Sequence, residues 1–313
     1  MITHTFLEFE AYASAVGDAD VRMVLPRLDK PRWEISEFNV DDFHLQYGSE
    51  WSGNIAEGVT RPDGKILFIP LHGRHHANGL PLDEHSVFVM NAASEFTISV
   101  QEPHDWCSLF LPSCPSEPAL SHRDSQASRS PSAYSVELDD QEMANLRWLL
   151  TQLHDSIQCN PDILNEKAAS RAVKDDLVKV CQRITSASQS SAATTGRPPF
   201  SRDEVIRVLR DLIANHSHEC LTIDDFTQAL DISERSLRNV FLEYYGMPPR
   251  KFLMIQRLNH VRNVLRVADP EETTVTAVAA HFGFWHFGRF AGAYHKIFQE
   301  SPSTTLYGSC QPC

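Results

Sequence analysis

The chain has 313 residues, of which 42% are hydrophobic and 22% charged, and this size and balance suit a globular protein of two domains. No apolar run approaches the roughly 20 residues that cross a bilayer, and the first residues lack the basic start and apolar core of a signal peptide. The seven cysteines are an odd number and are scattered along the chain, which favours a reduced, cytoplasmic protein without a membrane segment.

The formal net charge of −13 is unevenly distributed. Residues 1–199 hold 16 Lys and Arg against 28 Asp and Glu, whereas residues 200–313 hold 12 against 13. The second part is therefore close to neutral. Its net charge does not exclude an anionic partner, because affinity depends on where the cations lie.

Between about Arg32 and Leu111, short segments of alternating hydrophobicity predict β-strands. These segments are Trp33–Phe38, Phe43–Tyr47, Ile66–Leu71, Val87–Met90, Phe96–Val100 and Cys107–Leu111. Asp63-Gly64 and Asn78-Gly79 are typical of hairpin turns. Short strands with tight turns predict a sandwich or a small barrel, whose mouth would suit a small ligand.

A pair of helices is predicted over residues 136–184. One apolar stripe comprises Met143, Leu146, Leu149, Leu150, Leu153 and Ile157, and the other comprises Leu164, Ala168, Val173, Leu177, Val180, Cys181 and Ile184. The stripes would either pack on the barrel or form a dimer. Residues 185–199 are small, polar and of low complexity, and they predict a flexible linker.

The segment after Leu221 predicts a helix-turn-helix unit. Thr222 and Asp225 form an N-terminal capping pattern, and Ser233 caps a second helix. The exposed start of that second helix carries side chains that read bases in the major groove, where Arg pairs with guanine and Asn with adenine. These side chains are Arg235, Ser236, Arg238 and Asn239.

About fifty residues later the same pattern recurs. A short helix at Thr274–His281 and a turn at Gly283-Phe284 precede a helix from about His286 to Phe298, whose predicted apolar side is Phe287, Phe290, Tyr294 and Phe298. Its outward candidates for DNA contact are His286, Gly288, Arg289 and Lys296. Pro248-Pro249 opens a long helix that joins the two units. Two such units on one rigid helix predict contact with successive major-groove faces, about one DNA turn apart.

This arrangement resembles the C-terminal domain of the AraC/XylS family of bacterial transcription regulators. The matching residues are Leu230, Ile232-Ser233, Leu237, Phe241, Gly246, Arg257-Leu258, Leu265, Val278-Ala279, Gly283-Phe284, Phe290, Tyr294, Phe298 and Pro302. The run from Gly283 to Gly288, with Arg257-Leu258-Asn259, is most similar to the subgroup that includes ethanolamine-utilisation regulators. Gln299 stands where the family usually has Gly.

The resemblance implies an α+β multidomain protein. Residues 1–184 would form a cupin-like effector-sensing and dimerisation domain, residues 185–199 a linker, residues 200–308 a double helix-turn-helix domain and residues 309–313 a tail. The implied function is that of a DNA-binding transcription regulator, by family habit an activator that contacts RNA polymerase. Its expected partners are double-stranded promoter DNA, a small-molecule effector and a second copy of the chain.

Two other groups of residues suggest different chemistry. His72, His75, His76 and His85 lie close in sequence, and cupin enzymes hold metals with His and Glu, but Glu84 follows too late for the usual spacing, which favours a solvated loop. Arg74 and the histidines His72, His75 and His76 could instead contact an anionic effector.

Cys310 and Cys313 have redox-motif spacing without the surrounding fold that such motifs need. No phosphate-binding glycine loop or catalytic triad is present. We therefore expect no cofactor, no metal and no catalysis. The alternatives are a cupin-type metal enzyme with an accessory helical domain, or a regulator whose N-terminal domain only dimerises.

Overall fold

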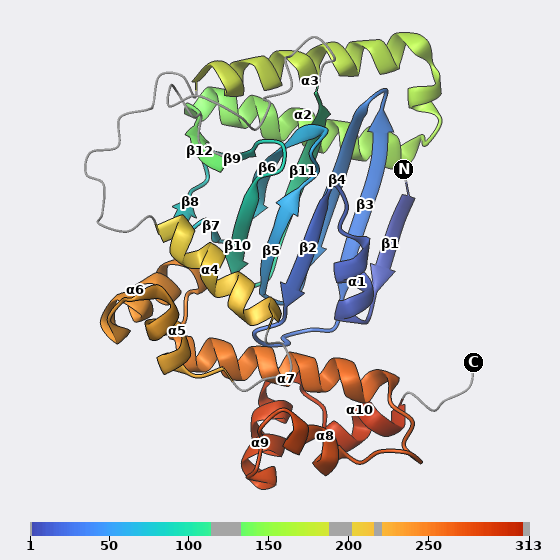
Figure 1. The fold of residues 1–313 in the computed structure, drawn as a ribbon. Helices are drawn as coiled ribbons and strands as arrows, with labels where there is room; N and C mark the ends of the chain where they lie inside the picture. The colour runs from blue at the N-terminus through green and yellow to red at the C-terminus, as the bar shows by residue number, and fades with distance from the viewer. Residues whose placement is uncertain (1, 114–132, 188–201, 216–220, 309–313) are drawn as a thin grey trace.

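A computed structural model of the chain describes residues 2–113, 133–187, 202–215 and 221–308. Two antiparallel sheets face each other in the first part, and helices form the rest, so the predicted α+β class is confirmed (Figure 1). The larger sheet has the order β1 (Ile2–Phe6), β3 (Trp33–Val40), β4 (Phe43–Glu50), β11 (His104–Pro112), β6 (Gly64–His72), β9 (Ser86–Met90) and β12 (Ala133–Glu137). The smaller sheet has the order β2 (Ala19–Val24), β5 (Asn54–Thr60), β10 (Glu95–Val100), β7 (His75–Ala77) and β8 (Leu80–Leu82).

Side chains of the larger sheet alternate between its two faces, as the pleat requires. On β6, Ile66 and Phe68 face the smaller sheet, whereas Leu67 and Ile69 face the opposite side. That opposite side is covered by α2 (Asp140–Cys159) and α3 (Lys167–Ala187), which lie across the sheet in Figure 1. The apolar stripes of the predicted helical pair thus pack on the sandwich. Their role in a dimer stays a prediction.

Asp139 begins α2 with a capping box, because its carboxylate accepts from the backbone N–H of Glu142 at 2.7 Å. The second helix, α3, continues to Ala187, three residues past the predicted end of the helical pair at residue 184. The remaining linker residues, 188–199, and the predicted tail at 309–313 lie outside the described residues.

The two predicted hairpin turns have different outcomes. Asn78-Gly79 joins the paired strands β7 and β8, and both residues have positive φ, at 48° and 78°, as a two-residue hairpin requires. The prediction at Asp63-Gly64 was wrong, because this turn leads from β5 in one sheet to β6 in the other. A turn signal fixes the local backbone and does not select the strand that pairs next.

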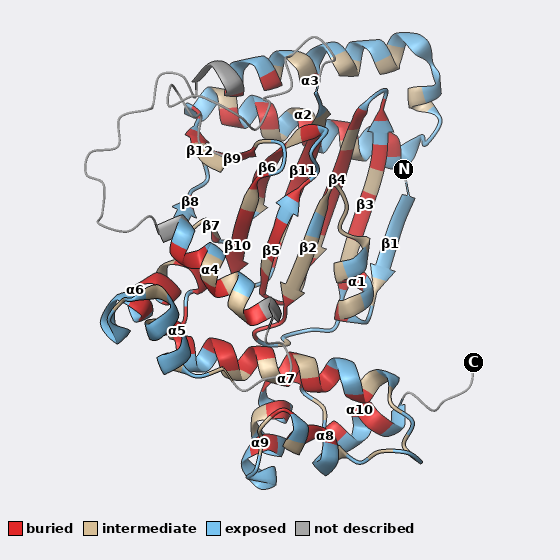
Figure 2. Cartoon of the chain, viewed as in Figure 1, coloured by how far each residue is buried: buried red, intermediate tan, exposed pale blue. Residues whose placement is uncertain are grey.

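The second part of the chain consists of helices. They are α4 (Arg202–Asn215), α5 (Ile223–Leu230), α6 (Glu234–Tyr245), α7 (Pro249–Val267), α8 (Val275–His281), α9 (Phe287–Phe298) and α10 (Pro302–Gly308). One side of α7 is fully buried at Ile255, Leu258, Val261 and Leu265. Figure 2 shows buried residues along α7, which faces the sandwich, and exposed residues on the outer sides of α6 and α9.

One hydrophobic cluster runs from the sandwich into the helices. It includes Tyr12 of α1 (Phe9–Ala15), Trp33 and Ile55 from the first part, and Tyr245 and Phe252 from the second. A continuous core of this kind holds the two parts in one arrangement.

Polar contacts cross the same interface. The Asn259 side chain accepts from the Leu25 backbone N–H at 3.2 Å and donates to the Leu25 carbonyl at 3.1 Å. Arg262 pairs with Glu10 at 2.6 Å, and Tyr245 donates to the buried carboxylate of Glu57 at 2.7 Å. The sequence reasoning did not predict these contacts.

Candidate nucleic-acid interface and ligand cavity

The first helix-turn-helix unit consists of α5 and α6. Thr222 caps α5 through a capping box with Asp225, and Asp231 ends it in the left-handed conformation, at φ 50°. Ser233 then caps α6 by accepting from the Ser236 backbone N–H at 3.1 Å. These local signals set the turn between the helices.

The four side chains predicted to contact DNA from this unit are all exposed on α6. Among the described residues, no hydrogen bond or ion pair engages the Arg235 or Arg238 guanidinium, so both are available to another molecule. Ser236 also shares a 3.0 Å hydroxyl–hydroxyl hydrogen bond with Ser233. Asn239 lies one turn after Arg235, so these two lie on the same side of the helix.

The second unit consists of α8 and α9. Thr274 caps α8 through the Ala277 N–H at 3.2 Å, and Gly283 takes φ 79° in the turn that follows, a conformation that favours glycine. Phe290 and Tyr294 are buried, as predicted. Phe287 was wrongly predicted to be buried. It is 41% exposed, because it lies in the first turn of α9 beyond the edge of the core.

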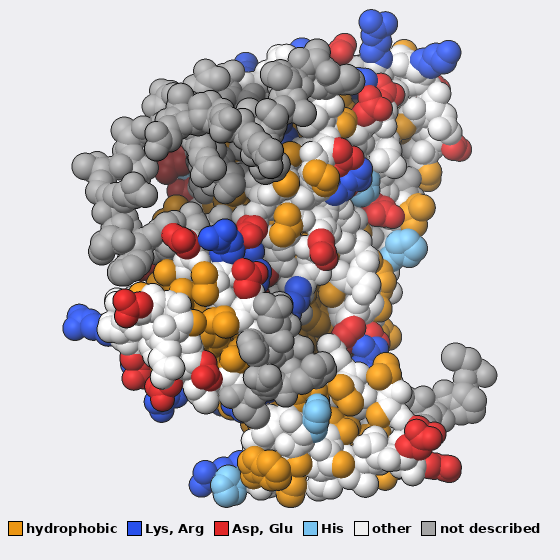
Figure 3. Space-filling view, viewed as in Figure 1, with side chains coloured by type: hydrophobic (Ala, Val, Ile, Leu, Met, Phe, Trp, Pro, Cys, Tyr) orange, Lys and Arg blue, Asp and Glu red, His pale blue; other side chains and the backbone are white. Residues whose placement is uncertain are grey.

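The outer face of α9 combines cations, small residues and aromatic rings. His286, Gly288, Arg289 and Lys296 are all exposed, and Trp285 just before the helix is 73% exposed. A Cβ added at Gly288 or Gly292 would meet no atom within 4 Å, so protein packing does not require glycine at either position. Figure 3 shows hydrophobic side chains beside Lys or Arg and His at the lower end of the molecule, where Figure 1 places α9.

Helix α7 joins the two units. Its 19 residues correspond to roughly 28 Å at 1.5 Å per residue, somewhat less than the roughly 34 Å of one DNA turn. Two of its cations face the sandwich instead of outward: Arg262 pairs with Glu8, Glu10 and Glu300, and Arg266 pairs with Glu8 and Glu10. The free cations of the helical part that were predicted to read DNA therefore lie on α6 and α9.

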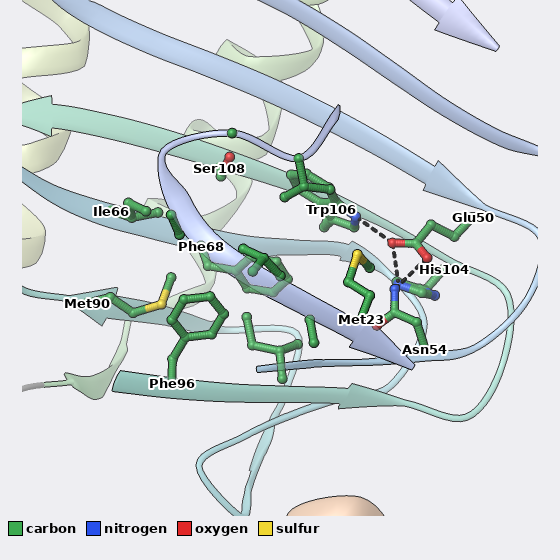
Figure 4. Close-up of a pocket in the computed structure, with 16 residues that line it drawn as sticks. Met23, Glu50, Asn54, Ile66, Phe68, Met90, Phe96, His104, Trp106 and Ser108 are labelled. Carbon is green, nitrogen blue, oxygen red and sulfur yellow. Dashed lines mark hydrogen bonds and ion pairs between the residues drawn. The ribbon is translucent and has the colours of Figure 1, made fainter. Parts of the chain in front are cut away.

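A separate cavity lies between the two sheets of the sandwich (Figure 4). Its volume is about 60 Å³. The wall is mainly aliphatic and aromatic and comes from both sheets and from the loop before β2. The lining residues are Val16, Gly17, Ala19, Val21, Met23, Glu50, Asn54, Ala56, Ile66, Phe68, Met90, Phe96, Ile98, His104, Trp106 and Ser108.

Glu50 is the centre of the polar end of this cavity. Its carboxylate accepts from the Tyr12 hydroxyl at 2.5 Å, from the Trp106 indole N–H at 2.9 Å and from the Asn54 amide. The His104 Nε2 lies 3.3 Å from the same carboxylate, and both side chains are almost fully buried. Figure 4 shows Glu50, Asn54, His104 and Trp106 gathered at one end, with Phe68, Met90 and Phe96 toward the other.

The two charged groups stabilise each other's ionised forms. Burial alone would lower the pKa of His104, but the charge and hydrogen bond of Glu50 outweigh it and raise that pKa. Burial would likewise raise the pKa of Glu50, but His104 and the hydrogen bonds of Tyr12 and Trp106 lower it. The His104 Nδ1 donates to the Glu102 carbonyl at 3.1 Å, so both ring nitrogens have acceptors.

The four residues proposed from sequence to contact an effector do not line this cavity. His75 was expected in a solvated loop, but it lies in strand β7 and is fully buried, with its ring against Phe68 and His104. Burial, followed by the charge of His104, lowers the pKa of His75 to about 3, so its ring is neutral. Arg74 is exposed and pairs with Glu102 at 3.1 Å, while His72 and His76 lie on either side of the β6–β7 turn.

No group of three or more His, Cys, Asp or Glu side chains with metal-binding geometry occurs among the residues that the structure describes. Within the same residues, no helix is both long and apolar enough to cross a membrane. Cys107 and Cys159 are free thiols, whereas Cys310 and Cys313 lie outside the described ranges.

Comparison with known proteins finds relatives of the helical part of the chain. A family model described as a helix-turn-helix domain matches residues 226–307. The chain is 36% identical to the probable thc operon regulatory protein of Rhodococcus erythropolis, over 33% of this chain and 31% of that protein. It is 29% identical to the XylDLEGF operon transcriptional activator of Pseudomonas putida, over 36% and 33% of the two chains. The chain thus matches only about a third of the length of these curated relatives.

A solved structure of a probable AraC family transcriptional regulator from Rhodopseudomonas palustris is 34% identical over 35% of this chain and 99% of that one, with a TM-score of 0.32. The paired units on α7 and the domain match define a domain of the helix-turn-helix class. Within that class, the chain belongs through its C-terminal domain to the AraC/XylS family.

Proposed function

We propose that this protein is a transcription regulator that binds double-stranded promoter DNA through α6 and α9, in two successive major-groove faces. One observation carries the proposal: two helix-turn-helix units on a single rigid helix expose unpaired arginines at the start of each second helix. The curated relatives support it, since their names describe operon regulation and transcriptional activation. By the same likeness, we propose activation through contact with RNA polymerase, a cytoplasmic location and no enzymatic activity.

We also propose that a small molecule in the sandwich controls DNA binding. Strand β2 supports this, because Ala19, Val21 and Met23 line the cavity, while Arg22 on its other face contacts His260 of α7 at 3.2 Å. The cavity wall is therefore also part of the contact with the helices. A ligand regulates only if it favours one arrangement of the two parts over another.

Strand β5 has the same two-sided character. Asn54 and Ala56 line the cavity, and Glu57 binds Tyr245 on the other side. A movement of β5 that enlarges the cavity would therefore also move Glu57, which binds Tyr245 of α6.

A homodimer is proposed through α2 and α3. A groove between these helices is lined in part by Leu146, Leu149 and Val180, and beside it Trp148 is 66% exposed. Exposed apolar area of this kind often marks a protein interface. The domain boundaries at residues 184 and 200 are also proposed.

The proposal is tested by gel-shift titration of the full chain on its own upstream DNA at several salt concentrations. Arg238→Ala should reduce discrimination against unrelated DNA by roughly 1–3 kcal/mol, as expected for a bidentate contact with guanine. Arg171→Ala, an exposed arginine on α3 that does not line the groove proposed for the dimer, is the matched control and should change nothing. An equal loss of affinity for all DNA sequences would indicate that Arg238 contacts phosphate. The absence of any salt-sensitive DNA binding would contradict the proposal.

A further inference from the structure

The opposite charges at the polar end of the sandwich cavity cancel each other within the protein. Glu50 and His104 are the two ionised side chains on the wall, and they pair at 3.3 Å with 2% and 3% of their surfaces exposed. A second buried charge brought in by a ligand would lose its hydration and find no free partner of opposite sign.

The hydrogen-bonding capacity of the pair is also largely occupied. Both N–H groups of the His104 imidazolium have acceptors, in Glu50 and in the Glu102 carbonyl. An anionic ligand would therefore find no spare donor on the one cation. The Glu50 carboxylate is surrounded by donors from Tyr12, Trp106 and Asn54, and these would have to be displaced before a cationic ligand could pair with it.

The rest of the cavity wall favours an apolar ligand. Phe68, Phe96 and Trp106 present aromatic surface, and Ile66 and Ile98 present aliphatic surface. The Ser108 hydroxyl and the Asn54 amide add uncharged polar atoms to the lining, as Figure 4 shows. Such a lining matches a ligand with an apolar body and at most an uncharged polar group.

The volume limits the ligand to a small one. At about 60 Å³ the cavity is smaller than an apolar protein cavity of roughly 150 Å³ that is known to admit benzene. Met23 and Met90 line it from opposite sheets, and their unbranched, flexible side chains can move to admit a single ring. Since Met23 lies on β2, such a movement occurs on the strand that also contacts α7.

We propose that the cavity binds a small, uncharged, mainly apolar molecule of about one ring, and that it discriminates against carboxylates and amines of the same shape. The inference rests on the proposed function in one respect, namely that this molecule would be the effector that the sandwich senses. The groups that confer the discrimination are Glu50 and His104, because their pairing leaves no net charge for a ligand to meet.

The test is a thermal-unfolding titration of the full chain with benzyl alcohol, benzoate and benzylamine, which share one ring and differ in charge. Benzyl alcohol should raise the Tm in a saturable manner, and the two ions should have no effect at equal concentration. A larger shift with benzoate or benzylamine would overturn the charge argument. No shift with any of the three would show that the space is only a packing void.

Cavity filling gives a second, independent measurement. Ala56→Leu should abolish the shift with benzyl alcohol, whereas Ala144→Leu, the same substitution at an exposed position on α2, should retain it. A shift retained in Ala56→Leu would place the ligand elsewhere. Direct calorimetric titration of the unsubstituted chain decides the charge question if Ala56→Leu does not fold.

Gel-shift titration of the same samples separates this inference from the proposed function. Intact binding to upstream DNA together with no response to benzyl alcohol would overturn the ligand inference alone. A saturable shift in Tm without any DNA binding would leave the cavity as a ligand site and overturn the regulator.

Discussion

The arginines of the helical part fall into two groups, those with a carboxylate partner and those without one among the described residues. Arg262 and Arg266 are held by carboxylates from the N-terminal segment, and Arg210 of α4 lies 3.2 Å from Glu95. Arg235, Arg238 and Arg289 are exposed and have no such partner among the described residues. Charge count alone does not separate these two groups, which explains how a nearly neutral domain can still present cations to DNA.

His75 gives a prediction about pH. Its pKa is about 3 in the folded protein and ordinarily near 6.5, so below pH 6.5 the unfolded chain binds a proton that the folded chain excludes. The free energy of unfolding should therefore fall as pH is lowered from 6.5, by up to about 1.4 kcal/mol per pH unit. The raised pKa of His104 acts in the other direction, since its stabilisation is complete below pH 6.5 and is lost only at higher pH.

Urea unfolding between pH 6.5 and pH 4.5 measures this slope. The upper part of this window, above about pH 5.5, lies above the range where protonation of Glu50 in the unfolded chain contributes to the slope. His75→Phe should remove most of the slope whatever its effect on stability at pH 7. An unchanged slope in this variant would mean that His75 is not the group responsible.

At the scale of elements, the sequence was most informative where hydrophobic periodicity coincides with a local signal. The starts of helices α5 to α9 were predicted to within one residue, and capping residues such as Thr222 and Ser233 mark two of these starts. Strands of the larger sheet with a regular apolar alternation, such as β3 and β4, were also predicted.

Strands β1, β2, β5 and β12 were missed. The helical pair was predicted from residue 136 but begins at Asp140, because residues up to Glu137 pair with β9 as part of β12. β1 is exposed along most of its length, and β5 buries the polar or small residues Asn54, Glu57 and Gly58, so neither has a clear alternation. The cavity was missed for a related reason. Its lining residues come singly from strands of both sheets, and only the folded topology brings them together.

The two glycines of α9 give a prediction at this scale. Gly288→Ala and Gly292→Ala should each stabilise the protein by about 0.5–1 kcal/mol, because a Cβ meets no neighbour there and alanine favours a helix. Chemical denaturation measures the change. As a control, Gly283→Ala should destabilise, since that residue has φ 79°. Loss of stability at 288 or 292 would contradict the open geometry of α9.

At the scale of the whole molecule, the sandwich and the helices share one core and a set of polar contacts. The Asn259 side chain satisfies both the N–H and the carbonyl of Leu25, and Leu28 donates its N–H to the Ile297 carbonyl at 2.7 Å. Because β2 and β5 contribute to both the cavity and this interface, ligand binding and the position of α6 and α7 are physically connected.

Asn259→Ala tests the strength of that connection. It leaves two buried backbone groups of Leu25 without partners, at a cost of about 1–3 kcal/mol for each group. We expect one unfolding transition for the unsubstituted chain in calorimetry, and two separate transitions for Asn259→Ala. Asn263→Ala, an exposed position one turn later on α7, should leave one transition at the original temperature. Identical curves for both variants would contradict the role of Asn259 at the interface.

The central claim is that α6 and α9 read one promoter in two successive major-groove faces. The measurement that tests it most directly is a hydroxyl-radical footprint of the full chain on its upstream DNA, compared with Arg238→Ala and Arg289→Ala. The account predicts two protected stretches about one helical turn apart, roughly 10 base pairs. Each substitution should weaken a different stretch. A single protected stretch, or the loss of both stretches with either substitution, would contradict the two-unit reading of DNA.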